Sequence, residues 1–291
     1  MKTRFIVNPR SGRATAALPA VRAFAARHGA GVTLTDAPRH ASALARQALA
    51  AGCTVIVAVG GDGTLNEIAS VLTGTAATLG LIPCGSGNGL GRHLGIHGSV
   101  ERSLAIVRAG HARLIDTGLA DGRPFFTTAG LGFEAEIAAR FNLLRRRGFA
   151  RYLTTSARAF TNYTPLSCII EQGGTRTAFR TFTLVVGNAD QYGNNSFITP
   201  GARVDDGLLN LTAIPPLTLF NFSPLVWRLF RGTLARDAAV VRLCAARFAV
   251  ERPAAGPIHT DGEVHAAPAR VEFAVQPASL RILAPADPTI R

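Results

Sequence analysis

Lysine is almost absent from this sequence. Of its 31 lysine and arginine residues, only Lys2 is a lysine. Three classes of enzyme need a lysine inside a particular motif: Walker-type NTPases in the phosphate loop, protein kinases on the third strand, and pyridoxal enzymes at the Schiff base. Lys2 stands in none of these contexts, so the sequence excludes all three classes.

Closely spaced cysteines and long apolar runs are also missing. The 4 cysteines lie far apart, and no pair has the spacing of a zinc ribbon or a thioredoxin motif. No stretch reaches the roughly 18 consecutive apolar residues that span a bilayer, and the apolar run near the N-terminus is too short for a signal peptide. We therefore expect a soluble, cytoplasmic protein with reduced cysteines that keeps its N-terminus.

What the sequence does contain is apolar residues and positive charge. The 291 residues are 47% hydrophobic and 17% charged, which is typical of one large or two ordinary domains with packed cores. The net charge of +13 favours anionic partners: phosphates, nucleic acid or an acidic membrane face. Because we find no helix-turn-helix, zinc or RNA-binding signature, we expect no nucleic-acid partner.

The first part of the chain alternates between short apolar runs and helical patterns, which is typical of a doubly wound α/β domain. We expect a largely parallel, three-layer domain over residues 1–115. Its expected strands are 4–7, 31–35, 54–59 and 78–83, and its expected helices are 14–28, 38–51, 65–72 and 99–109.

The pattern changes near residue 116 to β-rich segments with period 2. We expect a mostly antiparallel β-sandwich domain with inserted helices over residues 116–280, with residues 280–291 packing back on the first domain. Its expected strands are 125–128, 167–171, 181–186, 208–214, 240–250 and 271–275, and its expected helices are 134–144, 149–162 and 219–231.

The strongest local signal is GGDGTLNE at residues 60–67, between a buried strand and a helix. Gly60, Gly61 and Gly63 allow the backbone to approach phosphate oxygens, and the amides of the turn face an anion. A carboxylate such as Asp62 beside an anionic phosphate is explained if the two share a Mg²⁺ ion or if the carboxylate accepts a proton. Taken alone, this motif would be interpreted as a tight strand–helix turn capped by the aspartate.

Two further loops follow expected strands of the same sheet. NPRSGR at residues 8–13 follows the first, and PCGSGNGLGR at residues 83–92 follows the fourth. In the second of these, Gly85 lies beside Ser86 and Asn88, which offer hydrogen bonds, and Arg92 offers a charge-assisted donor. Because strand ends of a parallel sheet meet at one edge, the three loops together predict a pocket for a nucleotide polyphosphate.

The three loops, in this order and spacing, resemble the diacylglycerol kinase catalytic-domain family, whose superfamily includes sphingosine and ceramide kinases. VDDGLL at 204–209 and TDGE at 260–263 match further motifs of the family, so the resemblance covers essentially the whole chain. It implies a two-domain lipid kinase with ATP and Mg²⁺ in the cleft, which transfers the γ-phosphoryl group to a lipid hydroxyl such as that of diacylglycerol or a sphingoid base.

The resemblance also implies roles for individual residues. Those implied to contact ATP are Asn8, Ser11, Gly12, Arg13, Thr35, Gly61, Asp62, Gly63, Thr64, Asn66, Glu67 and Ser86. Asp62 and Asp116 would belong to a carboxylate network that binds Mg²⁺ through water, and Asp206 would be a ligand of a structural metal. Asp261 and Glu263 would stand at the lipid hydroxyl; we favour Glu263 as the general base and Asp261 as the second choice. Without the other motifs, TDGE would be interpreted as a β-turn.

This sequence departs from the family pattern at two places. Many bacterial members carry an aspartate where this chain has Gly89, so the third aspartate of the Mg²⁺ network is missing, and GSGNGL is closer to the sphingosine-kinase-like side. At the metal turn, Leu208 replaces an aromatic residue and Arg203 is the preceding basic residue, which leaves the structural metal open.

Two alternatives to a lipid kinase remain. An NAD kinase also uses GGDGT, and a nucleotide- or lipid-binding regulator without turnover would explain the missing aspartate. As partners we expect a lipid alcohol and, peripherally, the inner face of an anionic membrane; a homodimer remains open. Arg145, Arg146 and Arg147 with their apolar neighbours could form the membrane contact. For residues 219–231 we favour a helix with one face in the core and a solvated rear face.

Overall fold

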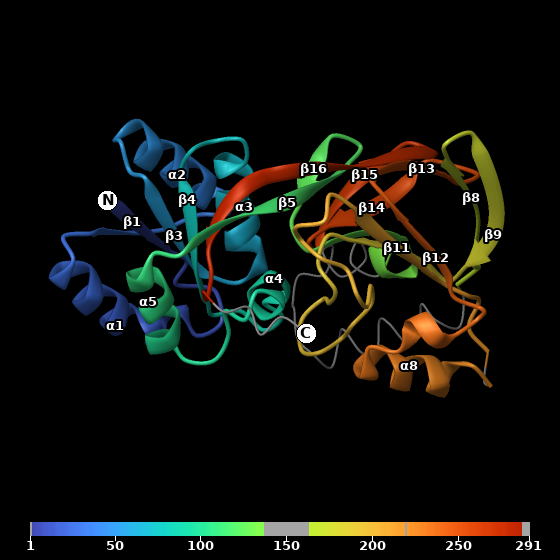
Figure 1. Ribbon diagram of the computed structural model, residues 1–291, viewed down its shortest axis with the longest axis horizontal. Coiled ribbons are helices and arrows are strands. Elements are labelled where there is room, and N and C mark those ends of the chain that lie inside the picture. Colours follow the sequence, from blue (N-terminus) through green and yellow to red (C-terminus); the bar gives the residue numbers. More distant parts are fainter. Residues whose placement is uncertain (1, 137–162, 219, 287–291) are drawn as a thin grey trace.

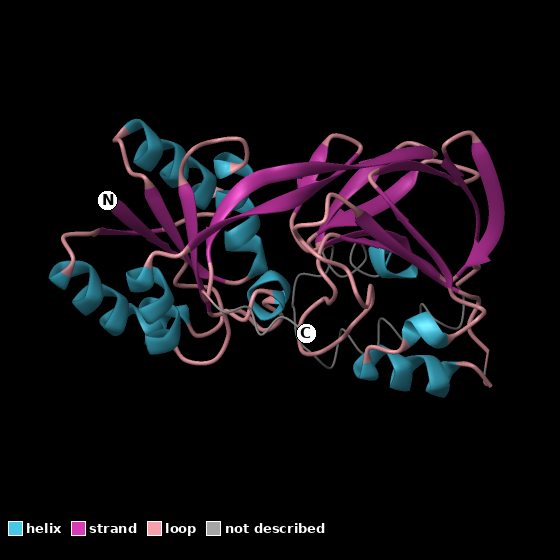
Figure 2. Cartoon of the chain, viewed as in Figure 1, coloured by secondary structure: helices cyan, strands magenta, loops and turns pink. Residues whose placement is uncertain are grey.

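The computed structural model describes residues 2–136, 163–218 and 220–286. The molecule is elongated, with an α/β lobe that holds the N-terminal third of the chain and a β-rich lobe that holds most of the rest (Figures 1 and 2). An α/β domain followed by a β-rich domain is the fold class expected from the sequence.

The α/β lobe is built on a parallel sheet with the strand order β2-β1-β3-β4. Its strands are β1 (Thr3–Val7), β2 (Gly31–Leu34), β3 (Val55–Gly60) and β4 (Thr78–Pro83), and its helices are α1 (Ala14–Arg27), α2 (His40–Ala50), α3 (Asp62–Leu72), α4 (Gly89–His93) and α5 (Val100–Ala109).

Both faces of this sheet are covered by helices. Phe5, Val7 and Val57 pack with α1 and α5 on one face, whereas Ile6 and Ile56 pack with α2 and α3 on the other. Because successive side chains of a strand point to opposite faces, a strand buried on both faces must be apolar at every position. The predicted doubly wound, three-layer domain is confirmed.

The β-rich lobe is a sandwich of two sheets. One is antiparallel in the order β12-β11-β10-β7-β14-β15, and the other contains β16, β13, β8 and β9. Phe125, Leu184, Leu211, Phe248 and Phe273 fill the space between them. The strands are β6 (Arg123–Phe125), β7 (Thr128–Gly132), β8 (Leu166–Gln172), β9 (Thr175–Thr181), β10 (Thr183–Gly187), β11 (Leu209–Ile214), β12 (Val241–Ala245), β13 (Arg247–Glu251), β14 (Gly256–Thr260) and β15 (Glu263–Ala267).

Two long antiparallel strands, β5 (Ala112–Ala120) and β16 (Arg270–Leu283), connect the lobes. The end of β16 pairs in parallel with β4, through Arg281 and Ile282, and its beginning pairs with β13 of the sandwich. One sheet therefore runs through both lobes (Figure 1). Residues 115 and 280, the expected domain limits, fall inside these two strands.

Some local elements differ from the expectation. The segment 240–250 forms two strands, because the chain passes from one sheet to the other at Ala246. The helix expected over 219–231 is α8 (Phe222–Arg231), followed by the short helix η1 (Leu234–Arg236). The helices expected at 134–144 and 149–162, with Arg145–Arg147, lie largely or wholly outside the described residues. Within the described ranges, no helix is long and apolar enough to cross a membrane.

Candidate active site

Three loops meet at the carboxyl edge of the parallel sheet and bind one another through main-chain hydrogen bonds. The amide of Arg13 donates to Cys84 O at 3.0 Å, the amide of Cys84 to Gly60 O at 2.7 Å, and the amide of Asn8 to Val59 O at 3.0 Å. The sequence-predicted convergence of the loops after β1, β3 and β4 is therefore present in the structure.

Glycines make this close approach sterically allowed. Gly12 has φ +47°, and a Cβ atom there would lie 2.0 Å from Cys84 O. A Cβ atom on Gly85 would lie 2.7 Å from Gly61 Cα. Neither contact is tolerable for a real side chain, so the loops keep their spacing only with glycine at these positions.

We expect Gly12→Ala to lower the free energy of unfolding by about 2–4 kcal/mol, because it adds both a left-handed strain and a main-chain clash. Gly63→Ala is the matched control: the same loop region has open space at Gly63, and alanine there favours helix α3. Urea denaturation of both variants measures the difference. Equal stability of the two variants would contradict this account of the loops.

Several predicted nucleotide ligands are used to hold the loops. The Asn8 side chain donates through Nδ2 to Thr64 Oγ1 at 3.0 Å, and the Asn88 side chain exchanges two hydrogen bonds with the backbone of Gly85. Arg92 Nε donates to Gly87 O at 3.1 Å. These residues therefore hold the loops in position relative to one another.

The other residues predicted to bind the nucleotide differ in their exposure to solvent. Gly12, Arg13, Gly63 and Ser86 are exposed, and Ser11, Gly61 and Asn66 are partly buried. Thr35 is buried, and its amide donates to Val7 O at 2.9 Å. Glu67 accepts from the amide of Ser42 at 3.3 Å, so its carboxylate joins α3 to α2.

Asp62 begins helix α3 and stands where the loops meet the β-rich lobe. Its carboxylate accepts hydrogen bonds from the amides of Asn88 at 2.8 Å and Gly89 at 3.0 Å. Burial raises the pKa of Asp62 above its ordinary value, although these hydrogen bonds oppose the change. The two bonds leave acceptor capacity on both oxygens, because a carboxylate has about four lone-pair directions.

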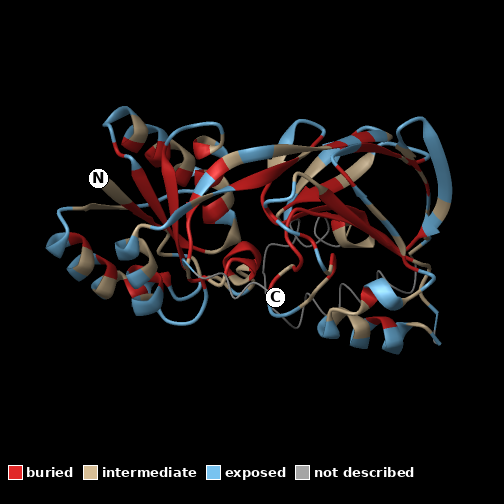
Figure 3. Ribbon diagram, viewed as in Figure 1, coloured by how far each residue is buried: buried red, intermediate tan, exposed pale blue. Residues whose placement is uncertain are grey.

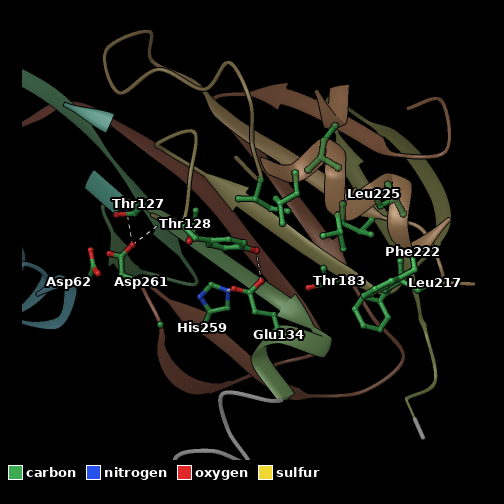
Figure 4. Close-up of a pocket in the computed structure, with 18 residues that line it drawn as sticks. Asp62, Thr127, Thr128, Glu134, Thr183, Leu217, Phe222, Leu225, His259 and Asp261 are labelled. Atoms are coloured by element: carbon green, nitrogen blue, oxygen red, sulfur yellow. Dashed lines mark hydrogen bonds and ion pairs between the residues drawn. The ribbon is translucent and has the colours of Figure 1, made fainter. Parts of the chain in front are cut away.

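Asp62 also lines a cavity of about 590 Å³ that extends into the β-rich lobe. Its polar end holds Asp62, Asp261, Thr127 and Thr128, and its other end is apolar (Figure 4). The apolar end is lined by Phe182, Ile198, Ile214, Leu217, Phe222, Leu225, Val226, Leu229 and Leu234, several of them on or beside α8.

Asp261 is fixed at the tip of the hairpin between β14 and β15. Its two oxygens accept four hydrogen bonds: from the amides of Phe126, Thr127 and Thr128 at 2.8, 2.8 and 3.0 Å, and from Asn66 Nδ2 at 2.9 Å. Burial raises the pKa of Asp261 against the effect of these donors. Its acceptor capacity is filled, and the Asn66 bond ties the hairpin to helix α3.

Glu263 is not among the residues that line the cavity. Its carboxylate pairs with Arg39 at 2.7 Å, and 49% of its side chain is exposed. Asp261 and Glu263, expected together at the lipid hydroxyl, therefore have different surroundings.

Asp116 is buried next to the VDDG turn. Its oxygens accept from the amides of Gly207 and Ala278, both at 2.7 Å. Burial raises the pKa of the neighbouring Asp206, and the charge of Asp116 adds to this effect. The structure thus brings Asp116 to Asp206, while Asp116 is not among the residues lining the cavity of Asp62. Among the described residues, no three metal-ligating side chains form a group that could hold an ion.

Sequence reasoning missed a polar cluster in the middle of the cavity (Figure 4). His259 Nε2 lies 3.2 Å from Glu134 Oε1, and the Tyr192 hydroxyl donates to the other Glu134 oxygen. Burial is the largest single effect and would lower the pKa of His259, but the charge and hydrogen bond of Glu134 and the charge of Asp261 together outweigh it and raise that pKa. The only sequence signal was that His259 lies two residues before Asp261 in the same hairpin.

Comparison with known proteins gives two family matches. Residues 2–120 match the diacylglycerol kinase catalytic domain, and residues 127–284 match the YegS C-terminal NAD kinase beta sandwich-like domain. A Pseudomonas fluorescens protein described as "Probable lipid kinase YegS-like" is 31% identical over 274 residues, covering 91% of this chain and 90% of the relative. This chain belongs to the YegS-like lipid kinase family.

Other relatives agree with this membership. A Mycobacterium tuberculosis protein named diacylglycerol kinase is 29% identical and covers 98% of this chain and 95% of its own length. The crystal structure of a diacylglycerol kinase from Bacillus anthracis shares the fold, with a TM-score of 0.80 at 22% identity over 98% of this chain and 97% of that one. As a YegS-like lipid kinase, the chain is a phosphotransferase with an alcohol acceptor.

The structure explains the glycine that this YegS-like lipid kinase carries at position 89. A Cβ atom there would lie 2.7 Å from Thr127 Cγ2 and 3.0 Å from the carbonyl oxygens of Gln191 and Tyr192. The β-rich lobe therefore occupies the space that an aspartate would need.

We expect Gly89→Asp to lower the free energy of unfolding by about 2–3 kcal/mol and to bring no gain in Mg²⁺-dependent turnover. Differential scanning calorimetry and a magnesium titration of activity test both parts. A variant of normal stability with raised magnesium affinity would show that the lobes can separate to admit the missing aspartate.

Proposed function

We propose that this protein transfers the γ-phosphoryl group of Mg²⁺·ATP to the hydroxyl of a membrane lipid such as diacylglycerol or a sphingoid base. The observation that carries the proposal is the position of Asp62. It stands between the glycine loops, which suit a polyphosphate, and a cavity with one polar and one long apolar end.

The ATP phosphates would lie on the loops after β1, β3 and β4. The first turn of α3 has amides without intrahelical partners, which favour an anion, and exposed Arg13 and Ser86 border the same loops. This arrangement supports a phosphate cradle that needs no lysine.

A magnesium ion fits this donor set if the nucleotide supplies most of its ligands. Mg²⁺ in phosphoryl-transfer sites is held by one or two carboxylates together with phosphate oxygens and water. Asp62 would be that carboxylate, because its oxygens keep unused acceptor capacity. When bound, the ion would neutralise charge on the phosphates.

Asp62 is also the group best placed to receive the proton of the acceptor hydroxyl. The acceptor oxygen would bond to the γ-phosphorus, the bond from that phosphorus to the bridging oxygen of ADP would break, and the hydroxyl proton would pass to Asp62. Asp261 is less suited because four donors already occupy its oxygens, and Glu263 is less suited because it pairs with Arg39 outside the cavity.

The lining of the cavity favours a lipid over a dinucleotide acceptor. Its far end offers phenylalanine, leucine and isoleucine side chains, which suit hydrocarbon chains and give the polar groups of NAD no partners. The NAD kinase alternative is therefore less well supported, although the C-terminal family model is described as NAD kinase beta sandwich-like.

Transfer of labelled phosphate from ATP tests the proposal. Diacylglycerol, a sphingoid base and NAD are offered separately, the lipids dispersed in detergent, with and without magnesium, and products are separated by chromatography. We expect a labelled lipid only with magnesium. A labelled NAD product alone would overturn the lipid acceptor, and ATP binding without a product from any acceptor, total lipid extract included, would favour a regulator.

A further inference from the structure

Helix α8 exposes an unusual amount of apolar surface. Trp227 is 58% exposed, Phe230 53%, and Phe220, just before the helix, 92%. Figure 3 shows much of α8 coloured as exposed. A solvated rear face was expected for this segment, and the large aromatic side chains exposed on it need an explanation. Contiguous apolar patches of this kind mark interaction sites.

Positive charge borders these aromatic residues. Arg231 and Arg236 are exposed, and the Arg231 guanidinium lies 5.3 Å from the centre of the Trp227 ring. Arg228 is partly buried and lies 3.4 Å from Asp237. Tryptophan and arginine side by side on a helix with a large apolar face are typical of elements that lie in a membrane interface.

The other side of the same helix belongs to the cavity. Leu225 is 5% exposed, and Leu225 and Leu229 line the apolar end of the cavity. Helix α8 therefore separates the interior of the cavity from the outer surface that carries Trp227 and Phe230. The turn before it is closed by the Thr218 amide, which donates to Asn221 Oδ1 at 2.7 Å, and the Leu229 carbonyl of the helix accepts from the Phe197 amide at 3.0 Å.

We propose that α8 docks this protein on an anionic phospholipid bilayer. Phe220, Trp227 and Phe230, named here the aromatic face, enter the boundary between head groups and acyl chains, and Arg231 and Arg236 contact lipid phosphates. The choice of a bilayer rests on this charge and on the continuity of α8 with the apolar cavity. That an acceptor lipid enters the cavity beside α8 rests in addition on the proposed function.

The chain carries its own probe, because Trp227 is the only tryptophan among the 291 residues. Vesicles of phosphatidylcholine with phosphatidylglycerol should shift its emission to shorter wavelength and sediment the protein. Vesicles of phosphatidylcholine alone should do so at least about tenfold more weakly. Brominated acyl chains should quench the emission if the indole reaches them. Unchanged emission and no sedimentation with anionic vesicles would overturn the proposal.

Two variants distinguish binding through the aromatic face from non-specific binding to vesicles. The double variant Phe220→Ser with Phe230→Ser keeps Trp227 and leaves the cavity lining intact. It should bind anionic vesicles at least about tenfold more weakly. Leu114→Ser, which alters a residue on β5 that is 45% exposed, is the matched control and should bind normally. Equal binding of both variants would overturn the proposal.

Activity assays distinguish this proposal from the proposed function. With the acceptor lipid in detergent, the double variant should keep the activity of the unmodified protein, whereas with the lipid in anionic vesicles it should lose most of it. If the unmodified protein binds anionic vesicles but is inactive in both assays, the proposed function is rejected and the docking proposal stands. If sedimentation velocity shows a dimer that the double variant dissociates, α8 is an interface between two copies and the bilayer proposal fails.

Discussion

Replacing Asp62 by asparagine should lower kcat for phosphoryl transfer by about a hundredfold to ten-thousandfold, the range that a general base contributes. Asparagine cannot take the hydroxyl proton, although its carbonyl oxygen still accepts one of the two amide hydrogen bonds from Asn88 and Gly89. The loss should appear in kcat and in kcat/KM alike. Steady-state kinetics with a detergent-dispersed lipid measure it, beside ATP binding in the absence of magnesium, which should be retained.

Glu263→Gln is the control for this result. Half of the Glu263 side chain and 81% of the Arg39 side chain are exposed, so the loss of this ion pair should cost at most about 1 kcal/mol of stability and leave kcat nearly unchanged. The opposite outcome, with full activity in Asp62→Asn and a large loss in Glu263→Gln, would return the role of base to Glu263, as the family resemblance first suggested.

The pH dependence gives a second readout of Asp62. Burial raises the pKa of this carboxyl above 3.8, and a base must be ionised to accept a proton. Activity should therefore fall as the pH drops through this raised pKa, at a higher pH than an exposed aspartate would give. The acidic limb of kcat/KM against pH should be missing from the residual activity of Asp62→Asn.

The architecture and the loops were predictable because they depend on local patterns. Apolar runs such as 54–59 identify strands buried on both faces, and glycines directly after them identify turns that nothing larger could form. Gly12 and Gly85 approach other loops so closely that no other residue fits. The glycines of the motifs therefore indicate where the loops come together.

The direction of side chains on the later motifs was not predictable. Asp261 and Glu263 are two residues apart, yet the Asp-Gly turn places Asp261 at φ +49° with its carboxylate against residues 126–128. Glu263 begins β15 and lies against Arg39 of the other lobe. Which carboxylate lines the cavity depends on this packing between distant segments. Local sequence patterns therefore do not predict it. The same holds for Glu134 and His259, which meet only in the folded sandwich.

Replacing Asp261 by asparagine should lower the free energy of unfolding by about 3 kcal/mol or more. The carboxylate accepts three buried main-chain amides and the Asn66 side chain, and hydrogen bonds to a charged group contribute about 1.5–3 kcal/mol each. Asparagine keeps one acceptor oxygen, but its NH₂ group would face two of these donors. Asparagine tolerates the left-handed turn, so the change isolates the hydrogen bonds from the turn geometry.

The chain offers a matched control in the hairpin between β5 and β6. Asp121 has φ +50° and is also followed by a glycine, but its side chain is exposed. Asp121→Asn should change stability by less than about 0.5 kcal/mol. Chemical denaturation of both variants, followed by circular dichroism, measures the difference.

Because Asn66 of α3 is one of the four donors, Asp261→Asn should also loosen the contact between the lobes, and amide hydrogen exchange should rise at residues 126–128. Similar stability in the two variants would mean that Asp261 is an ordinary turn residue, and that other contacts hold α3 against the β14–β15 hairpin.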